Sequence, residues 1–144
     1  MTVDADAGTV FPLLCPVREH DWIDAWRCSM VYSESGVAEA GCVFLTELPG
    51  RGPETWMVSR YEPNRAIEFC RVAGVSRTCH LTIALSDHGD GTTTLDWTYS
   101  HTGIDEAGKR WVEAYSAERF RGEMEGMEAR LGHYLREGEM LRAS

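Results

Sequence analysis

The middle of the chain alternates between apolar and polar positions, most clearly over residues 75–85 and 92–101. In the first run one face carries Cys79, Leu81, Ile83 and Leu85, and in the second it carries Leu95, Trp97 and Tyr99. A period of two is the spacing of a strand with one buried and one solvated face. Both runs are therefore predicted to be strands of an antiparallel sheet that is wet on one side.

Four shorter strand-like runs precede them, at residues 28–32, 42–48, 55–61 and 66–72. Turn residues (Gly, Pro, Asn and Asp) separate all of these runs, which predicts an antiparallel meander of six strands. Residues 1–9 could add a very short seventh strand. Pro12 and Pro16 restrict residues 10–26 to two short helical pieces, because proline cannot continue a helix.

A long helix is predicted from Asp105 to about Leu141. Six apolar residues fall on one stripe about 100° wide: Phe120, Met124, Met127, Leu131, Tyr134 and Leu135. Trp111 and Tyr115 lie on the opposite side of the helical wheel. The helix is therefore expected either to bend or break near Ser116 or to bury two faces.

Composition narrows the function classes. The 144 residues fit one domain over 1–144, and 43% of them are hydrophobic, enough for a core. A net charge of −9 disfavours nucleic-acid partners. No apolar run approaches the roughly 18 residues of a membrane span, and no signal peptide opens the sequence. The five cysteines are accordingly interpreted as reduced thiols in the cytoplasm. No metal site and no cofactor motif is recognised.

Five segments resemble the START/polyketide-cyclase (SRPBCC) superfamily: residues 10–19 followed by Trp22 and Trp26, and residues 41–44, 55–58, 93–99 and 133–135. The likeness covers about residues 10–138. It implies an α+β helix-grip fold, in which a curved antiparallel sheet of six or seven strands surrounds a long C-terminal helix, with two short helices near the N-terminus. It also implies a cavity between sheet and helix, where members bind lipids, sterols or polyketides. The superfamily usually begins with a full edge strand, which residues 1–9 barely allow.

The predicted partner is a hydrophobic small molecule, aromatic or polycyclic. Candidate wall residues are Trp26, Trp56, Trp97, Tyr99, Met124, Met127 and Tyr134. Aromatic rings suit such a ligand, and methionine adapts to irregular shapes.

Three residues are candidates for catalysis. His101 follows Tyr99 at the same strand parity and could transfer protons, or it could lie hydrated at the rim. Arg60 shares the parity of Trp56. An inward arginine needs an acidic ligand or a buried carboxylate, although both its long stem and its place at a strand end would also let it reach solvent. Glu19 could have a pKa raised by apolar neighbours, or could favour the positive end of a helix.

Arg71 and Arg77 raise the same question as Arg60, since each shares the parity of apolar neighbours. If such groups converge on one cavity, the protein could be an enzyme of the cyclase or dehydratase type. A carrier needs only a large apolar cavity with one or two polar anchors.

A third hypothesis is a protein-interaction module that forms a homodimer through the outer face of the C-terminal helix, around Trp111 and Tyr115. Gly122, Gly126 and Ala129 lie near that direction on the wheel. Small residues there would let another helix approach closely, or would simply be tolerated on a solvated face.

Overall fold

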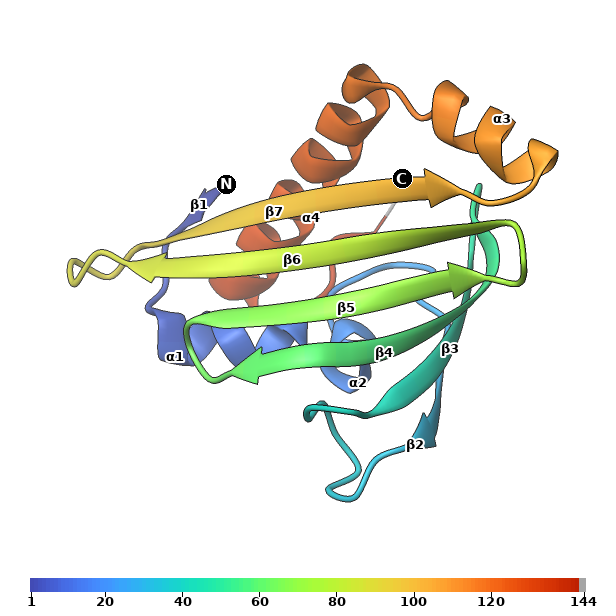
Figure 1. Ribbon diagram of the computed structural model, residues 1–144. Helices are drawn as coiled ribbons and strands as arrows, with labels where there is room; N and C mark the ends of the chain where they lie inside the picture. Colours follow the sequence, from blue (N-terminus) through green and yellow to red (C-terminus); the bar gives the residue numbers. More distant parts are fainter. Residues whose placement is uncertain (143–144) are drawn as a thin grey trace.

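The computed structural model describes residues 1–142 (Figure 1). Its seven strands are β1 (Thr2–Val3), β2 (Cys28–Tyr32), β3 (Val43–Leu48), β4 (Gly52–Glu62), β5 (Ala66–Ala73), β6 (Arg77–Asp87) and β7 (Thr93–Gly103). They form one antiparallel sheet in the order β1-β7-β6-β5-β4-β3-β2. The sheet curves, and a long C-terminal helix crosses behind it (Figure 1). The predicted helix-grip α+β fold is confirmed.

The two long strands β6 and β7 pair regularly along their whole length, with Leu81 opposite Tyr99 and Ile83 opposite Trp97. The side chains on their inner face are the apolar residues predicted from the alternation of apolar and polar positions. At the sheet edge, β1 pairs with β7, and the N-terminal ammonium donates to the Leu95 carbonyl at 2.9 Å. The seventh strand is therefore present and has two residues.

Residues 10–26 contain the two predicted helical pieces, a 3₁₀ turn η1 (Phe11–Leu14) and α2 (Pro16–Glu19), and a further short helix, α1 (Ala7–Val10), precedes them. A proline lies near the start of both η1 and α2, where a backbone N–H would have no partner within the helix, so its absence costs no hydrogen bond. Trp22 and Trp26 hold the segment together, since their indole N–H groups donate to the carbonyls of Leu13 and Pro16, each at 2.8 Å.

The C-terminal helical region breaks where the opposed stripes indicate. Helix α3 (Glu106–Ala114) and helix α4 (Ala117–Glu137) are separated by Tyr115 and Ser116. Asp105 caps α3 by accepting from the Gly108 N–H at 2.7 Å, and Ser116 caps α4 by accepting from the Arg119 N–H at 3.1 Å. The single helix predicted to reach Leu141 is thus wrong in length, because the left-handed Gly138 ends α4. No helix in residues 1–142 is long and apolar enough to span a membrane.

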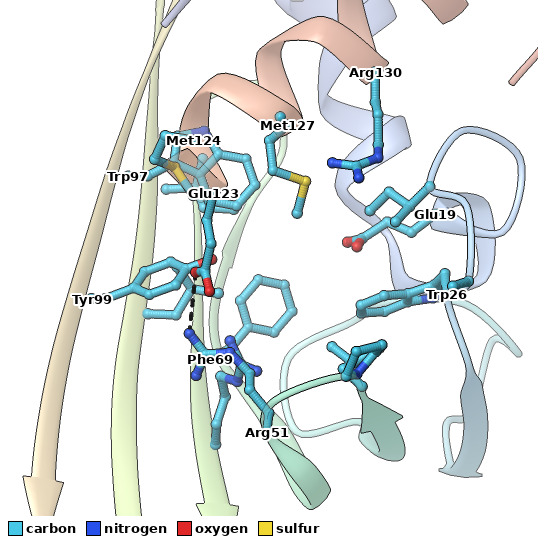
Figure 2. A pocket seen from close by; sticks show the side chains of 18 of the residues that line it. Glu19, Trp26, Arg51, Phe69, Trp97, Tyr99, Glu123, Met124, Met127 and Arg130 are labelled. Carbon is cyan, nitrogen blue, oxygen red and sulfur yellow. Dashed lines mark hydrogen bonds and ion pairs between the residues drawn. The ribbon is translucent and has the colours of Figure 1, made fainter. Parts of the chain in front are cut away.

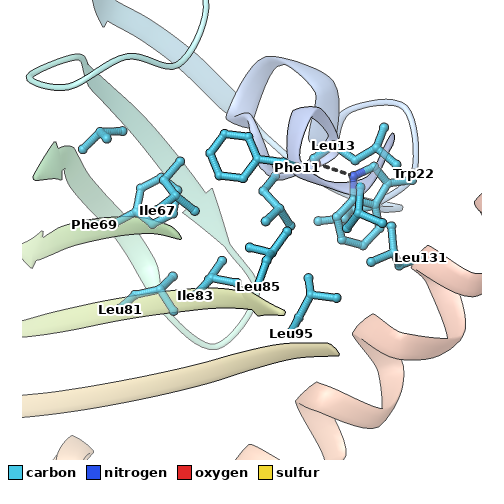
Figure 3. Packing of buried hydrophobic residues seen from close by; sticks show 14 of the residues in the cluster. Phe11, Leu13, Trp22, Ile67, Phe69, Leu81, Ile83, Leu85, Leu95 and Leu131 are labelled. Atoms are coloured by element: carbon cyan, nitrogen blue, oxygen red, sulfur yellow. Dashed lines mark hydrogen bonds between the residues drawn. The ribbon is translucent and has the colours of Figure 1, made fainter. Parts of the chain in front are cut away.

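The hydrophobic core lies between the N-terminal segment, the inner face of the sheet and the C-terminal half of α4 (Figure 3). Leu131 is the most deeply buried residue of α4, with no part of it exposed to solvent. It packs with Trp22, Leu95 and their neighbours. The N-terminal half of α4 has no such anchor, and this half borders a cavity.

Candidate functional site

A cavity of about 600 Å³ separates the inner face of the sheet from the N-terminal half of α4 (Figure 2). Its size falls within the range of small-molecule sites, roughly 300–1,000 Å³. Much of its wall is apolar or aromatic: Ile23, Trp26, Leu48, Pro49, Trp56, Phe69, Leu81, Ile83, Trp97, Tyr99, Met124 and Met127. The inner wall comes from the alternating strand residues, and the outer wall comes from α4 and from the segment after α2.

The cavity exists partly because α4 presents glycines to it. Gly122 and Gly126 both line the cavity, and a Cβ built on Gly122 would have no neighbour within 4 Å. Two of the three small residues that could have admitted another helix thus border this cavity. Trp111 and Tyr115 also turn toward the body of the molecule, with their rings 5.3 Å and 4.5 Å from the ring of His101. Homodimer formation stays a prediction, and neither the glycines nor the two aromatic residues now support it.

The aromatic wall is held rigidly. The Trp56 ring stacks on Phe44 at 5.1 Å and meets Trp26 and Phe69 edge-on at 6.1 and 5.5 Å. Its indole N–H donates to the Thr46 hydroxyl at 2.7 Å. Edge-on and offset pairs are the favoured aromatic geometries, so this wall has a fixed shape.

Six of the seven candidate wall residues line the cavity: Trp26, Trp56, Trp97, Tyr99, Met124 and Met127. Tyr134 does not, and the expectation for it is wrong. It lies nearly three turns beyond Met124 on α4, where the helix packs against the core cluster.

One end of the cavity is charged: Arg71 of β5 and Arg51 of the turn before β4 line it, and Glu54 of β4 and Arg77 of β6 contact these two arginines. Arg71 donates to Glu54 at 2.5 Å, and both side chains are 2% exposed. Arg77 lies 3.8 Å from the other Glu54 oxygen and donates to the Arg51 carbonyl at 2.6 Å. The Arg71 guanidinium also stacks on Trp56, 3.9 Å from the ring centre. Both arginines with inward parity are therefore buried and share one carboxylate.

A second carboxylate completes this end. Glu123 of α4 lies 3.5 Å from Arg51 and 3.5 Å from Arg119, and it accepts a 2.6 Å hydrogen bond from the Tyr115 hydroxyl. Arg51 also lies against the rings of Tyr99 and Tyr115, at 5.5 and 5.2 Å from their centres. Figure 2 shows the Arg51–Glu123 contact at the lower edge of the cavity.

Four guanidinium groups thus share two carboxylates in this cluster, which we call the arginine cluster: Arg51, Arg71, Arg77 and Arg119 with Glu54 and Glu123. The excess positive charge acts on its neighbours. The pKa of His101 is lowered to about 4, mainly by burial and then by the charges of Arg51 and Arg71. Burial also lowers the pKa of Arg77, against the attraction of Glu54. His101 is therefore neutral at neutral pH.

Glu19 carries a different charge state. It ends α2, and its carboxyl points into the cavity from the side opposite the sheet (Figure 2). Burial raises the pKa of Glu19 well above its usual range, although Arg71 lowers it somewhat. No hydrogen bond to this carboxyl forms among residues 1–142. The cavity consequently contains a carboxylic acid that keeps its proton at pH values where an exposed glutamate is ionised.

Arg60 does not reach the cavity, and the parity argument for it is wrong. Val58 pairs with Phe69, but Arg60 pairs with Glu68, so Ser59 is an extra residue in β4. Such a bulge inverts the alternation beyond it. The Arg60 side chain is 51% exposed on the outer face, where it pairs with Glu62 and Glu68 at 3.0 and 2.9 Å.

His101 borders a smaller adjoining pocket of about 400 Å³ under the junction of α3 and α4, not the main cavity. Trp97 and Tyr99 line both spaces and form the partition between them. Of the three candidates for catalysis, only Glu19 lines the main cavity.

Sequence reasoning missed Arg51, Glu54 and Glu123. The signal for Glu54 was available, since it shares the parity of Trp56 and Val58 on the near side of the bulge. Glu123 lies four residues before Met127 on the helix, a spacing that places both on one face. Arg51 belongs to a turn, where no periodicity indicates direction.

Comparisons with known proteins found similar folds but no similar sequence. No family model matches the chain, and no curated protein matches its sequence. DynU16, a protein of the dynemicin biosynthetic locus, has a similar crystal structure: TM-score 0.69, 20% identity, covering 96% of this chain and 46% of DynU16. Protein CV1439 from Chromobacterium violaceum gives a TM-score of 0.58 at 15% identity, covering 92% of this chain and 90% of CV1439. CalU16 from Micromonospora echinospora gives 0.48 at 20% identity, covering 92% of this chain and 85% of CalU16. This chain spans less than half the length of DynU16.

Proposed function

We propose that this protein binds an apolar, aromatic or polycyclic small molecule in the cavity between the sheet and α4. The observation that carries the proposal is the cavity of about 600 Å³ with its rigid aromatic wall. A chain that needed only a packed interior would fill such a space, because protein cores tolerate few voids larger than a water molecule. The resemblance to the SRPBCC superfamily and the fold shared with DynU16, from a biosynthetic locus, support a small-molecule role.

Two measurements test this function. Native mass spectrometry of the purified protein is expected to show a co-purified small molecule. The neutral fluorophore N-phenyl-1-naphthylamine serves as a defined probe, because it gains fluorescence in an apolar, water-poor site. We expect saturable binding at one site per chain.

The site of the probe is tested with a matched pair of variants. Met127 lines the cavity, so Met127→Trp places a larger side chain in it and should weaken probe binding at least tenfold. Met57 is 43% exposed on the other face of the sheet, so Met57→Trp should leave binding unchanged. Equal effects of the two substitutions, or no saturable binding by the native protein, would refute the proposal.

A second candidate function is an acid-assisted reaction of the cyclase or dehydratase type, and Glu19 favours it. In a dehydration, the neutral Glu19 carboxyl would donate its proton to a substrate hydroxyl, which would leave as water. The resulting carboxylate would take a proton from the adjacent carbon, forming the double bond and restoring the acid. Such a role requires that Glu19 be protonated at neutral pH.

The protonation state can be measured directly by NMR of protein labelled with ¹³C at the glutamate carboxyls, with Glu19→Gln to assign the signal. A carboxyl that titrates well above the ordinary glutamate range is expected. If Glu19 titrates with the exposed glutamates, it cannot serve as this acid at neutral pH.

A further inference from the structure

We propose that the arginine cluster is an oxyanion-binding subsite, so that the ligand of the cavity is an amphipathic molecule with an anionic oxygen at this end. This inference rests on the proposed function and specifies the chemistry of the ligand. The oxyanion would lie against Arg51 and Arg71, and the apolar body would lie along Phe69, Trp26 and Met127.

The first argument is an unpaired donor. Arg71 lines the cavity and its side chain is only 2% exposed, yet its Nε has no hydrogen-bond partner among residues 1–142. A buried donor on a charged group that lacks an acceptor destabilises the fold, and native proteins leave few such donors. Glu54 does not meet this need, since it binds the terminal Nη2 atom of Arg71.

The second argument is charge. Four guanidinium groups are neutralised by only two carboxylates, and one of these, Glu123, makes only long contacts of 3.5 Å with its two arginines. Arg51, Arg71 and Arg77 are each at most 8% exposed, so water screens the excess poorly. The remainder of the protein has the opposite character, with a net charge of −9 over the whole chain. The chain as a whole is acidic, yet at one end of the cavity its buried arginines outnumber their carboxylate partners. This local excess of positive charge makes that end a site for an anion.

The third argument is the distribution of donors along the wall. Trp97 also lines the cavity, and its indole Nε1 is buried without a partner among residues 1–142. Figure 2 shows Trp97 beside Met124, on the far side of Tyr99 from Arg51. An indole N–H is a neutral donor, suited to a carbonyl, ether or hydroxyl oxygen. The ligand is therefore an oxygenated aromatic whose anionic oxygen is at the arginine end.

Carboxylates and ionised phenols share this oxyanion chemistry, and a matched set of naphthalenes distinguishes them. N-phenyl-1-naphthylamine reports occupancy of the cavity, and three competitors displace it: 2-naphthoate, its neutral analogue 2-naphthamide, and 2-naphthol. The carboxylate and the carboxamide have nearly the same shape and differ in charge. We expect 2-naphthoate to bind at least tenfold more tightly than 2-naphthamide at neutral pH and low ionic strength.

The location of the subsite is tested with Arg51→Met. The Arg51 carbonyl that accepts from Arg77 stays in place, and Glu123 keeps Arg119 and Tyr115 as partners, so the fold should survive. Arg71 remains in this variant, so the preference for carboxylate over carboxamide should fall at least threefold without vanishing, while the affinity for 2-naphthamide stays the same. Arg60→Met, the same substitution on the outer face, should retain the full preference.

Each result separates the two proposals. If neither the reporter nor 2-naphthamide binds, the proposed function fails and this inference fails with it. If 2-naphthamide and 2-naphthoate bind the native protein equally, only the oxyanion subsite is refuted. A preference as large in Arg51→Met as in the native protein would refute its placement at the arginine cluster. Tight binding of 2-naphthol with the absorption spectrum of the naphtholate would support a phenol as the source of the oxyanion, and binding of the neutral form alone would support a carboxylate.

Discussion

Helix α4 is fastened to the core in its C-terminal half and borders the cavity in its N-terminal half, and two truncations on one helix test this difference. Leu131 is completely buried among core residues. Its replacement by Ala should cost about 3 kcal/mol, within the roughly 2–5 kcal/mol typical of buried leucines. Met124, two turns earlier, faces the hollow. Met124→Ala should cost about 1 kcal/mol or less, because few packed contacts are lost and alanine is the better helix former.

The assay is equilibrium unfolding in urea, followed by circular dichroism. With a slope of about 2 kcal/mol per molar urea for a chain of this size, the midpoint should fall by about 1.5 M for Leu131→Ala and by at most about 0.5 M for Met124→Ala. The slopes should stay equal, since the same surface unfolds. Equal losses at the two positions would mean that α4 packs uniformly on the sheet, and the reasoning about the cavity would be refuted.

Further predictions concern glycines and titrating groups. Gly108→Ala should destabilise the protein by about 2 kcal/mol or more, because its Cβ would lie 1.8 Å from the Ser76 carbonyl oxygen. Gly122→Ala has open space around its Cβ and should stabilise the protein by up to about 1 kcal/mol, so thermal unfolding should show a lower midpoint for the first variant and a higher one for the second. The native state keeps the proton of Glu19 at pH values where the unfolded chain releases it, so the native protein should lose stability as the pH rises above about 4.5. Glu19→Gln should lose less stability over the same pH range, and an equal pH dependence of the free energy of unfolding in the two proteins would contradict this. His101 stays neutral in the native state down to about pH 4, so the native protein should lose stability as the pH falls from about 6.5 toward 4. His101→Phe should lose less stability over this range, and a His101 ring that titrates near pH 6.5 by NMR would contradict the prediction.

Strand parity located the cavity wall where pairing is regular. β6 and β7 pair without interruption, so the alternation correctly placed Trp97 and Tyr99 inward. The same rule failed at Arg60, because one extra residue in β4 inverted the faces. The bulge depends on pairing with β5, which a single strand's sequence does not reveal. Parity therefore predicts direction only between irregularities.

The helical stripes indicated either a bend or break near Ser116 or two buried faces, and the structure shows the break; they did not indicate the hollow beside α4. Periodicity shows which face of a helix is apolar, and both a filled core and a ligand cavity require an apolar face. The distance between α4 and the sheet depends on where the helix is anchored, chiefly at Leu131, and on the glycines it presents. The arginine cluster was equally hidden, since it joins a turn residue to side chains from three strands and from helix α4.

The most direct test is a methyl NMR titration of protein labelled at its six methionines, with N-phenyl-1-naphthylamine as the added molecule. Met124 and Met127 line the cavity, whereas Met57 lies on the outer face of the sheet. The ring current of a bound naphthalene should shift the methyl signals of Met124 and Met127 and leave that of Met57 in place. If the first two stay unmoved at saturation, or if Met57 moves instead, the space beneath α4 does not receive an aromatic guest.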